Sequence, residues 1–90
     1  MLVLITYDLK QPEKDYNSLY ESIKNCGSKW WHYMESVWLI HTDLRPNECF
    51  ERIRDNFSSE DRCFVVEITH QDRQGWLPSK AWEWIKENGI

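Results

Sequence analysis

Apolar residues at the start of the chain occupy both odd and even positions. From Leu2 to Tyr7 every residue is apolar or favours β-structure, and the run ends at Asp8. A strand that is covered on both faces has this pattern, because both alternating sets of side chains are buried. The sequence therefore predicts a strand over residues 2–7 with an aspartate at its carboxyl end.

Two later stretches have the spacing of amphipathic helices. The first would use Asp15 as its N-cap and Gly27 as its stop. The second begins at Pro46, which suits the first helical position, and runs to about Phe57 behind Arg45, a poor capping side chain. The apolar stripe of the first helix consists of Tyr16, Leu19, Tyr20, Ile23 and Cys26.

The remaining chain predicts three more strands and a closing helix. The aromatic and β-branched stretch 29–42 exceeds one typical strand, so two antiparallel strands that meet near Glu35 and Ser36 fit best. Residues 62–69 predict a fourth strand that is apolar on both parities. After a polar loop, Trp76 and Leu77 predict a short edge strand, and residues 78–88 predict a helix.

The order of these elements is β-α-β-β-α-β followed by a tail, which is the ferredoxin-like arrangement of the α+β class. We predict a ferredoxin-like core over residues 1–69 and a tail over residues 70–90, with a short strand and a helix, that packs on the core or on a partner chain. The two core helices cover one sheet face. Because the first and fourth strands are apolar on both faces, the Trp-rich tail or a second copy must cover the other. We predict a homodimer in which sheet faces or swapped tails meet.

Composition narrows the function classes. The 90 residues carry a net charge of −4, and their eleven lysines and arginines are scattered, so a strongly basic nucleic-acid face is not indicated. Cys26, Cys49 and Cys63 have no CxxC spacing and predict reduced, buried thiols. The first apolar stretch is too short for a signal peptide or a membrane span, so we expect a cytoplasmic protein without a membrane partner.

Two short stretches resemble motifs of one known family. Tyr7-Asp8-Leu9 is similar to the strand-terminal Y-D-(I/V) of the CRISPR-associated Cas-two proteins and their VapD-type relatives, and Glu35-Ser36-Val37-Trp38 is similar to their Q-x-S-V-F stretch. The order and length of elements agree over residues 1–69. The resemblance implies a ferredoxin-like homodimer in which the strand-one aspartates approach each other. It also implies a CRISPR integrase subunit or an antitoxin as a protein partner.

The resemblance implies a metal role for Asp8. In active members the paired aspartates share Mg²⁺, or Mn²⁺, for phosphodiester hydrolysis of RNA or DNA, whereas other members bridge DNA without catalysis. Tyr7 and Ser36 are the implied catalytic neighbours. Two carboxylates held close raise each other's pKa unless a cation intervenes, and Mg²⁺ accepts a few carboxylates plus waters. One aspartate per chain therefore suffices only in a dimer.

This sequence has fewer candidate residues for binding nucleic-acid phosphates than the family has. His32 stands where an arginine is usual, and Lys10, Lys14 and Lys29 are the candidates that would replace part of the phosphate grip. Trp38 could stack on a base, although core packing is the better interpretation of this ring.

Three functions stay open at this point. The first is a dimeric Mg²⁺-dependent endonuclease, the second a catalytically silent dimer that scaffolds nucleic acid or a protein, and the third a ferredoxin-like dimer that binds a small molecule. Asp8 itself has two interpretations, because aspartate also ends strands by bonding to its own turn.

Overall fold

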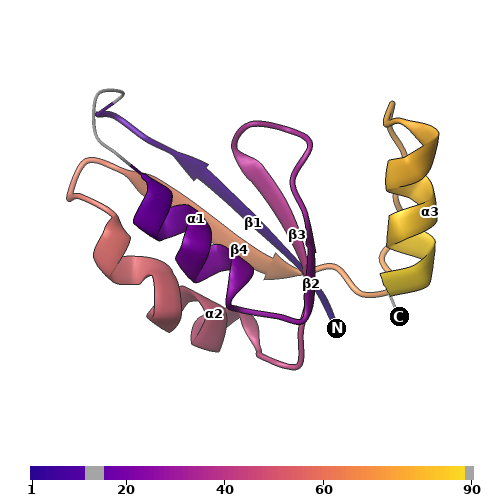
Figure 1. Ribbon diagram of the computed structural model, residues 1–90, viewed down its shortest axis with the longest axis horizontal. Coiled ribbons are helices and arrows are strands. Elements are labelled where there is room, and N and C mark those ends of the chain that lie inside the picture. Colours follow the sequence, from indigo (N-terminus) through magenta and orange to yellow (C-terminus); the bar gives the residue numbers. More distant parts are fainter. Residues whose placement is uncertain (12–15, 89–90) are drawn as a thin grey trace.

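The computed structural model describes residues 1–11 and 16–88, and within them the protein is an α+β domain (Figure 1). The α+β class and the order of the core elements are confirmed. The elements are β1 (Leu2–Asp8), α1 (Asn17–Lys24), β2 (Lys29–Trp31), β3 (Val37–His41), α2 (Pro46–Ile53), the 3₁₀ helix η1 (Arg54–Asn56), β4 (Arg62–Glu67) and α3 (Ser79–Asn88).

The four strands form one antiparallel sheet in the order β2-β3-β1-β4, which is compatible with a small ferredoxin-like domain. β1 lies in the interior and pairs with β3 on one side and β4 on the other. Its run of apolar residues suits this position, because a central strand has neighbours at both edges and packed side chains on both faces.

The helices α1 and α2 cover one face of the sheet, and Figure 1 shows them together on the same side. The odd residues of β1, Val3, Ile5 and Tyr7, point into this core. The predicted stripe of α1 packs against them, with Tyr20 partly buried. The buried set is Val3, Ile5, Tyr7, Tyr16, Leu19, Ile23, Cys26, Trp38, Ile40, Cys49 and Ile53.

A second cluster lies on the opposite face, where α3 packs. Leu2, Leu39 and Ile85 form its buried centre. The ring nitrogen Nδ1 of His41 lies 2.8 Å from the carbonyl oxygen of Asn88 and ties the end of α3 to β3. The partly buried members are Leu4, Trp31, Ile68, Leu77, Trp82 and Trp84. The tail therefore covers the part of this face nearest the start of β1.

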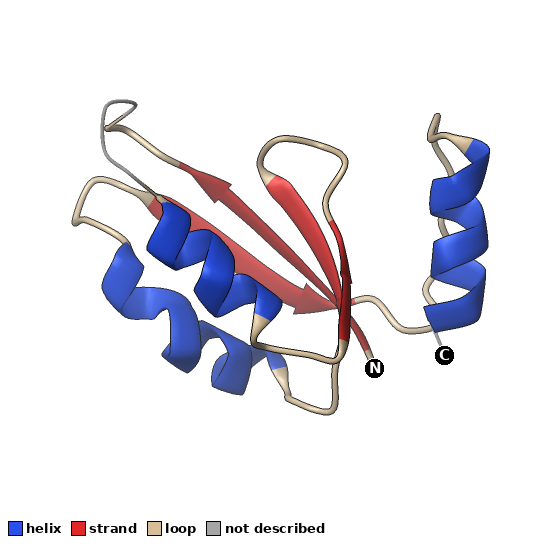
Figure 2. Cartoon of the chain, in the orientation of Figure 1, coloured by secondary structure: helices blue, strands red, loops and turns tan. Residues whose placement is uncertain are grey.

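The predicted edge strand at Trp76 and Leu77 is wrong. Residues 70–78 of the described chain contain no strand, and Figure 2 shows a loop from β4 to α3. The Arg73 guanidinium holds this loop, since it donates to the carbonyls of Ile68 and Gln71 at 2.9 Å each. Leu77 packs under α3, while Trp76 is fully exposed. Although this pair favours β-structure, the chain here forms a loop that crosses to the other face of the sheet to reach α3.

Both helices of the core are shorter than predicted. α1 ends at Lys24, and Gly27 does not adopt a left-handed conformation as a stop. Gly27 is needed for close approach instead, because a Cβ there would collide with the carbonyl oxygen of His41. α2 gives way to η1 after Ile53, and its first turn is closed by the Glu48 carboxylate, which accepts the backbone N–H of Arg45 at 2.9 Å. Asp15, the predicted N-cap of α1, lies outside the described residues.

No helix in the described ranges combines the length and the apolarity needed to cross a bilayer.

Candidate functional site

The strand register places Asp8 on the sheet face opposite α1 and α2. Side chains alternate along a strand, so the even residues of β1 point away from the core that Val3, Ile5 and Tyr7 fill. Asp8 is the last residue of β1, and its direct partner on β4 is Arg62. Directly paired residues of an antiparallel ladder lie on the same face. The side chains of Asp8 and Arg62 therefore extend from neighbouring backbone positions on the same face.

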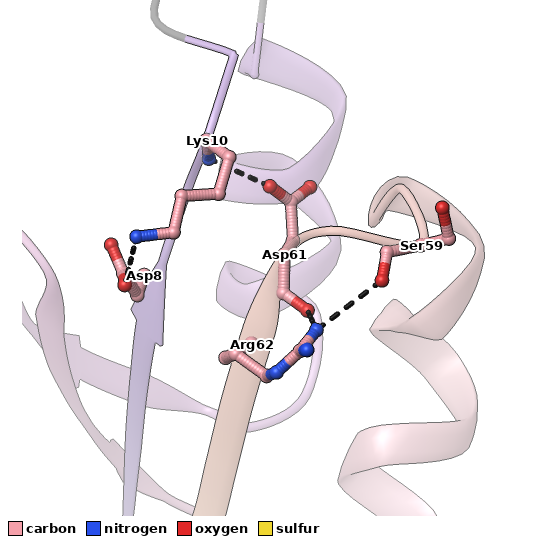
Figure 3. Close-up of polar contacts among 5 residues, drawn as sticks. All are labelled: Asp8, Lys10, Ser59, Asp61 and Arg62. Atoms are coloured by element: carbon pink, nitrogen blue, oxygen red, sulfur yellow. Dashed lines mark hydrogen bonds and ion pairs between the residues drawn. The ribbon is translucent and has the colours of Figure 1, made fainter.

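Lys10 supplies a second cation at this point. Its Nζ lies 2.8 Å from Oδ2 of Asp8, and Figure 3 shows the side chain folded back over the end of β1. The two side chains are 52% and 64% exposed, so the pair contributes about 0 to 1 kcal/mol. A bond this weak leaves the Asp8 carboxylate available to a stronger ligand.

Asp61 fixes the backbone beneath this ion pair. Its Oδ1 accepts the backbone N–H of Lys10 at 2.8 Å (Figure 3). Its Oδ2 accepts the N–H and hydroxyl of Ser58 at 2.9 and 3.0 Å. The Asp61 side chain is buried and joins the segment after β1 to the turn before β4. Asp61 therefore fixes the backbone position from which the Lys10 side chain extends toward Asp8.

Arg62 is held by the same turn. Its Nη1 donates to the carbonyl oxygens of Asp61 at 2.9 Å and of Ser59 at 3.2 Å (Figure 3). A shallow hollow beside it is lined by Thr6, Tyr7, Asp8, Arg62, Cys63 and Phe64. A carboxylate with the Lys10 ammonium beside it and Arg62 at the register position opposite is a sensible set for a phosphodiester, since cations attract its oxygens and the carboxylate can hold a metal ion.

Sequence reasoning missed Asp61 and Arg62. Residues 58–61 showed only the composition of a polar turn, and Arg62 only the start of a strand. The available signal was the register: an interior β1 that pairs antiparallel with β4 brings the end of one strand to the start of the other. We name Asp8, Lys10, Asp61 and Arg62 the Asp8 cluster.

Tyr7 lies on the other side of the sheet from Asp8. Its hydroxyl accepts the indole N–H of Trp38 at 2.9 Å and donates to the carbonyl oxygen of Glu35 at 3.3 Å. Burial, against the hydrogen bond from Trp38, raises the pKa of this phenol above its ordinary value. Ser36 lies next to it, and its carbonyl oxygen accepts the backbone N–H of Tyr7 at 3.3 Å. Tyr7 and Ser36 thus hold the β2–β3 connection against β1.

Trp38 and His32 form a stacked pair. Their rings are 3.8 Å apart and nearly parallel, and Tyr20 and Trp30 contact the same indole. Trp38 is only 1% exposed. In this fold its ring therefore has no face open to a nucleic-acid base, and it packs as the core residue that its hydrophobicity favoured.

Lys29, another predicted phosphate contact, does not join the Asp8 cluster. It is exposed at the start of β2 and pairs in register with His41, whereas Asp8 lies past Thr6, which pairs with Val37 at the opposite end of β3. Lys14 lies outside the described residues. Among the predicted binding residues that the structure describes, only Lys10 contacts Asp8.

The described part of one protomer offers few metal-ligating side chains near Asp8. Among residues 1–11 and 16–88, no three His, Cys, Asp or Glu side chains are placed to hold one together. Asp8 offers a single exposed carboxylate. Mg²⁺ commonly takes one or two carboxylates and keeps several waters. Asp8 supplies one such carboxylate, and a second copy of the chain would supply another.

A comparison with protein-family models and with curated proteins found no match for this sequence.

Proposed function

We propose that the protein is a ferredoxin-like homodimer of the Cas-two type that hydrolyses phosphodiester bonds in RNA or DNA with Mg²⁺. The observation that supports this proposal is the position of Asp8, exposed on the sheet face opposite α1 and α2, with Lys10 in an ion pair with it and Arg62 paired with it in register across β1 and β4. This combination would place a metal-binding carboxylate near two groups that attract phosphate, once Arg62 leaves the carbonyls of Ser59 and Asp61.

The uncovered part of that sheet face supports a dimer. α3 packs over Leu2 and Leu39, but the face continues through Thr6 and Phe64 to Asp8. Phe64 is 63% exposed although it lies within a strand of the sheet. An exposed apolar patch on a sheet suits association with a second copy. A two-fold axis through this patch would bring the two Asp8 carboxylates toward each other.

Each residue of the Asp8 cluster has a role in this proposal. The two Asp8 carboxylates would hold the ion, which neutralises phosphate charge and activates water when it is bound. Lys10 would leave its weak ion pair with Asp8 and turn to a phosphate oxygen, and Arg62 would hold a second one. Asp61 is a positioning residue, because it fixes the backbone N–H of Lys10.

Cleavage of a mixed panel of RNA and DNA tests the catalytic claim. We expect cleavage with Mg²⁺, none with a chelator, and a loss of about 10²-fold or more in Asp8→Asn. The matched control is Asp43→Asn, since Asp43 is also an exposed acid but follows β3 at the other end of the sheet. Cleavage that survives Asp8→Asn, or falls equally in both variants, would reject the mechanism.

A second candidate is a catalytically silent dimer that scaffolds DNA, RNA or a protein. The observation that favours it is the Asp8–Lys10 ion pair, which already neutralises the carboxylate. Under this proposal the protein acts in a CRISPR or toxin–antitoxin setting, beside an integrase subunit or an antitoxin. Mobility-shift measurements with and without chelator separate the two candidates. Binding without any cleavage, unchanged by chelator and by Asp8→Asn, would select the scaffold.

A further inference from the structure

Two of the three cysteines meet in the helical layer, away from the Asp8 cluster. Cys26 follows α1 and Cys49 lies in α2, and they are 2% and 0% exposed. Sγ of Cys26 lies 3.9 Å from the carbonyl oxygen of Cys49, and its thiol donates to the carbonyl oxygen of Ser22 at 3.3 Å. The chain thus packs two thiol-bearing residues together between neighbouring helices.

Cys26 also borders solvent. It lines a hollow of about 250 Å³ together with Gly27, Ser28, His41, Thr42, Asp43, Leu44 and Arg52. The Arg52 guanidinium donates to the carbonyl oxygen of Asn25 at 3.4 Å, so a cation stands over the turn that carries Cys26. Cys26 is thus part of the wall of this hollow, whereas Cys49 is not among the residues that line it.

The two thiols differ in acidity. Interaction with the neighbouring Cys49 side chain, with help from Arg52, lowers the pKa of Cys26 against the effect of burial. The same interaction, followed by burial, raises the pKa of Cys49. Thiolate is the form of cysteine that attacks peroxides and disulfides. Cys26 is therefore the more acidic thiol of the pair, and it is also the one that lines the hollow.

We propose that Cys26 and Cys49 form a peroxide-sensitive dithiol, in which Cys26 is oxidised first and Cys49 closes an intramolecular disulfide between the end of α1 and α2. The Cys26 thiolate attacks one oxygen of hydrogen peroxide, the O–O bond breaks, and hydroxide leaves and takes up a proton to form water. Cys26 is then a sulfenic acid. The Cys49 sulfur, giving up its proton, attacks the Cys26 sulfur, and the S–O bond breaks to release a second water. The thiols lose two electrons in total, and the peroxide gains them.

Cys63 provides a control within the same chain. It lies on β4, is partly buried, and borders the hollow beside Asp8. Burial raises the pKa of Cys63 to about 11, so its thiol is protonated at neutral pH. Because the proposal does not use the Asp8 cluster, it stands or fails independently of the proposed nuclease activity.

Treatment of the folded protein with hydrogen peroxide, followed by intact mass and peptide mapping, tests the proposal. We expect a product that has lost two hydrogens, with Cys26 joined to Cys49 and Cys63 still a free thiol. The thermal midpoint should rise by about 5 to 15 °C, because the cross-link restricts the unfolded chain, and a reductant should reverse the rise. Cys63→Ser should behave in the same way.

Two variants separate the roles of the pair. Cys49→Ser should stop at a sulfenic acid on Cys26 that a dimedone-type reagent traps, and Cys26→Ser should leave Cys49 unmodified. Peptide mapping of the unmutated chain keeps the test valid if a variant fails to fold. Oxidation of Cys63 before Cys26, a bridge between two chains, or a Cys26–Cys49 bond that appears only after denaturation would overturn the proposal.

Discussion

The indole N–H of Trp38 donates a hydrogen bond of 2.9 Å to the hydroxyl of Tyr7 inside the helix-facing core. The same hydroxyl donates to the carbonyl oxygen of Glu35, so one phenol links β1, β3 and the connection before β3. Because side chains alternate along β1, fixing Tyr7 on this face fixes Asp8 on the other. Tyr7, to which the family resemblance gives a catalytic role, thus also fixes the sheet face on which Asp8 lies.

Tyr7→Phe tests that role. The variant keeps the ring but leaves the buried Trp38 N–H without its acceptor, which should cost about 1 to 2 kcal/mol of unfolding free energy in a urea titration. Tyr33→Phe is the control, because Tyr33 is largely exposed and the loss of its hydroxyl should change stability little. Equal stability of the two variants would show that the Tyr7 hydroxyl does not support the fold.

Gly27→Ala should destabilise the protein through a backbone collision. The added methyl would meet the carbonyl oxygen of His41 and Cγ2 of Ile40, so the turn after α1 must move away from β3. We expect a loss of about 1 to 3 kcal/mol by chemical denaturation. Gly75→Ala, where a Cβ meets open space, should be neutral or slightly stabilising. A neutral Gly27→Ala would contradict the close approach.

Sequence periodicity predicted the core elements because each signal there reports burial. The stripe of α1 and the two-sided apolar pattern of β1 end in the two clusters, whereas on β4 Cys63 and Val65 join the first cluster and Phe64 stays exposed. The pattern could not reveal that Gly27 serves a contact with His41, since that contact joins positions distant in sequence. It also misassigned Trp76 and Leu77, where a local β preference had no strand to pair with.

The candidate site was predictable only in part, for the same reason. Asp8 has a local signal, an acid at the end of an apolar run, and Lys10 is its neighbour in sequence. Arg62 and Asp61 reach the site through the β1–β4 register, which depends on the fold. Trp38 was a candidate for base stacking from its type alone, yet the fold encloses it between aromatic rings.

Phe64→Asp should break the proposed dimer without unfolding the protomer. Phe64 is exposed in a single chain, so its replacement removes little packing there, but a dimer seam would have to bury a charge. Light scattering behind a sizing column should report a dimer for the unmutated protein and a monomer for Phe64→Asp. Trp76→Asp is the control, because Trp76 is also an exposed aromatic residue but lies on the loop before α3, outside the sheet. A monomer before mutation, or a dimer after it, would count against the seam.

Stability should fall as the pH rises from 9 toward 11, and Cys63 should contribute to the fall. Burial raises the pKa of Cys63 from 9.0 to about 11 in the folded protein. In this interval the unfolded thiol loses its proton while the folded thiol retains it, so the folded state binds more protons and the unfolding free energy decreases with pH. Urea titrations across the interval should show a shallower fall in Cys63→Ala. An unchanged slope would remove Cys63 as a cause.

The most direct test of the proposed site is a crystal structure of the protein grown with Mn²⁺, located by its anomalous scattering. We predict one ion per dimer, held by the Asp8 carboxylates of both protomers, with Lys10 turned away from Asp8. Two Asp8 carboxylates too far apart to share a hydrated ion, or Asp8 still bound only to Lys10 with no ion beside it, would contradict the shared metal site.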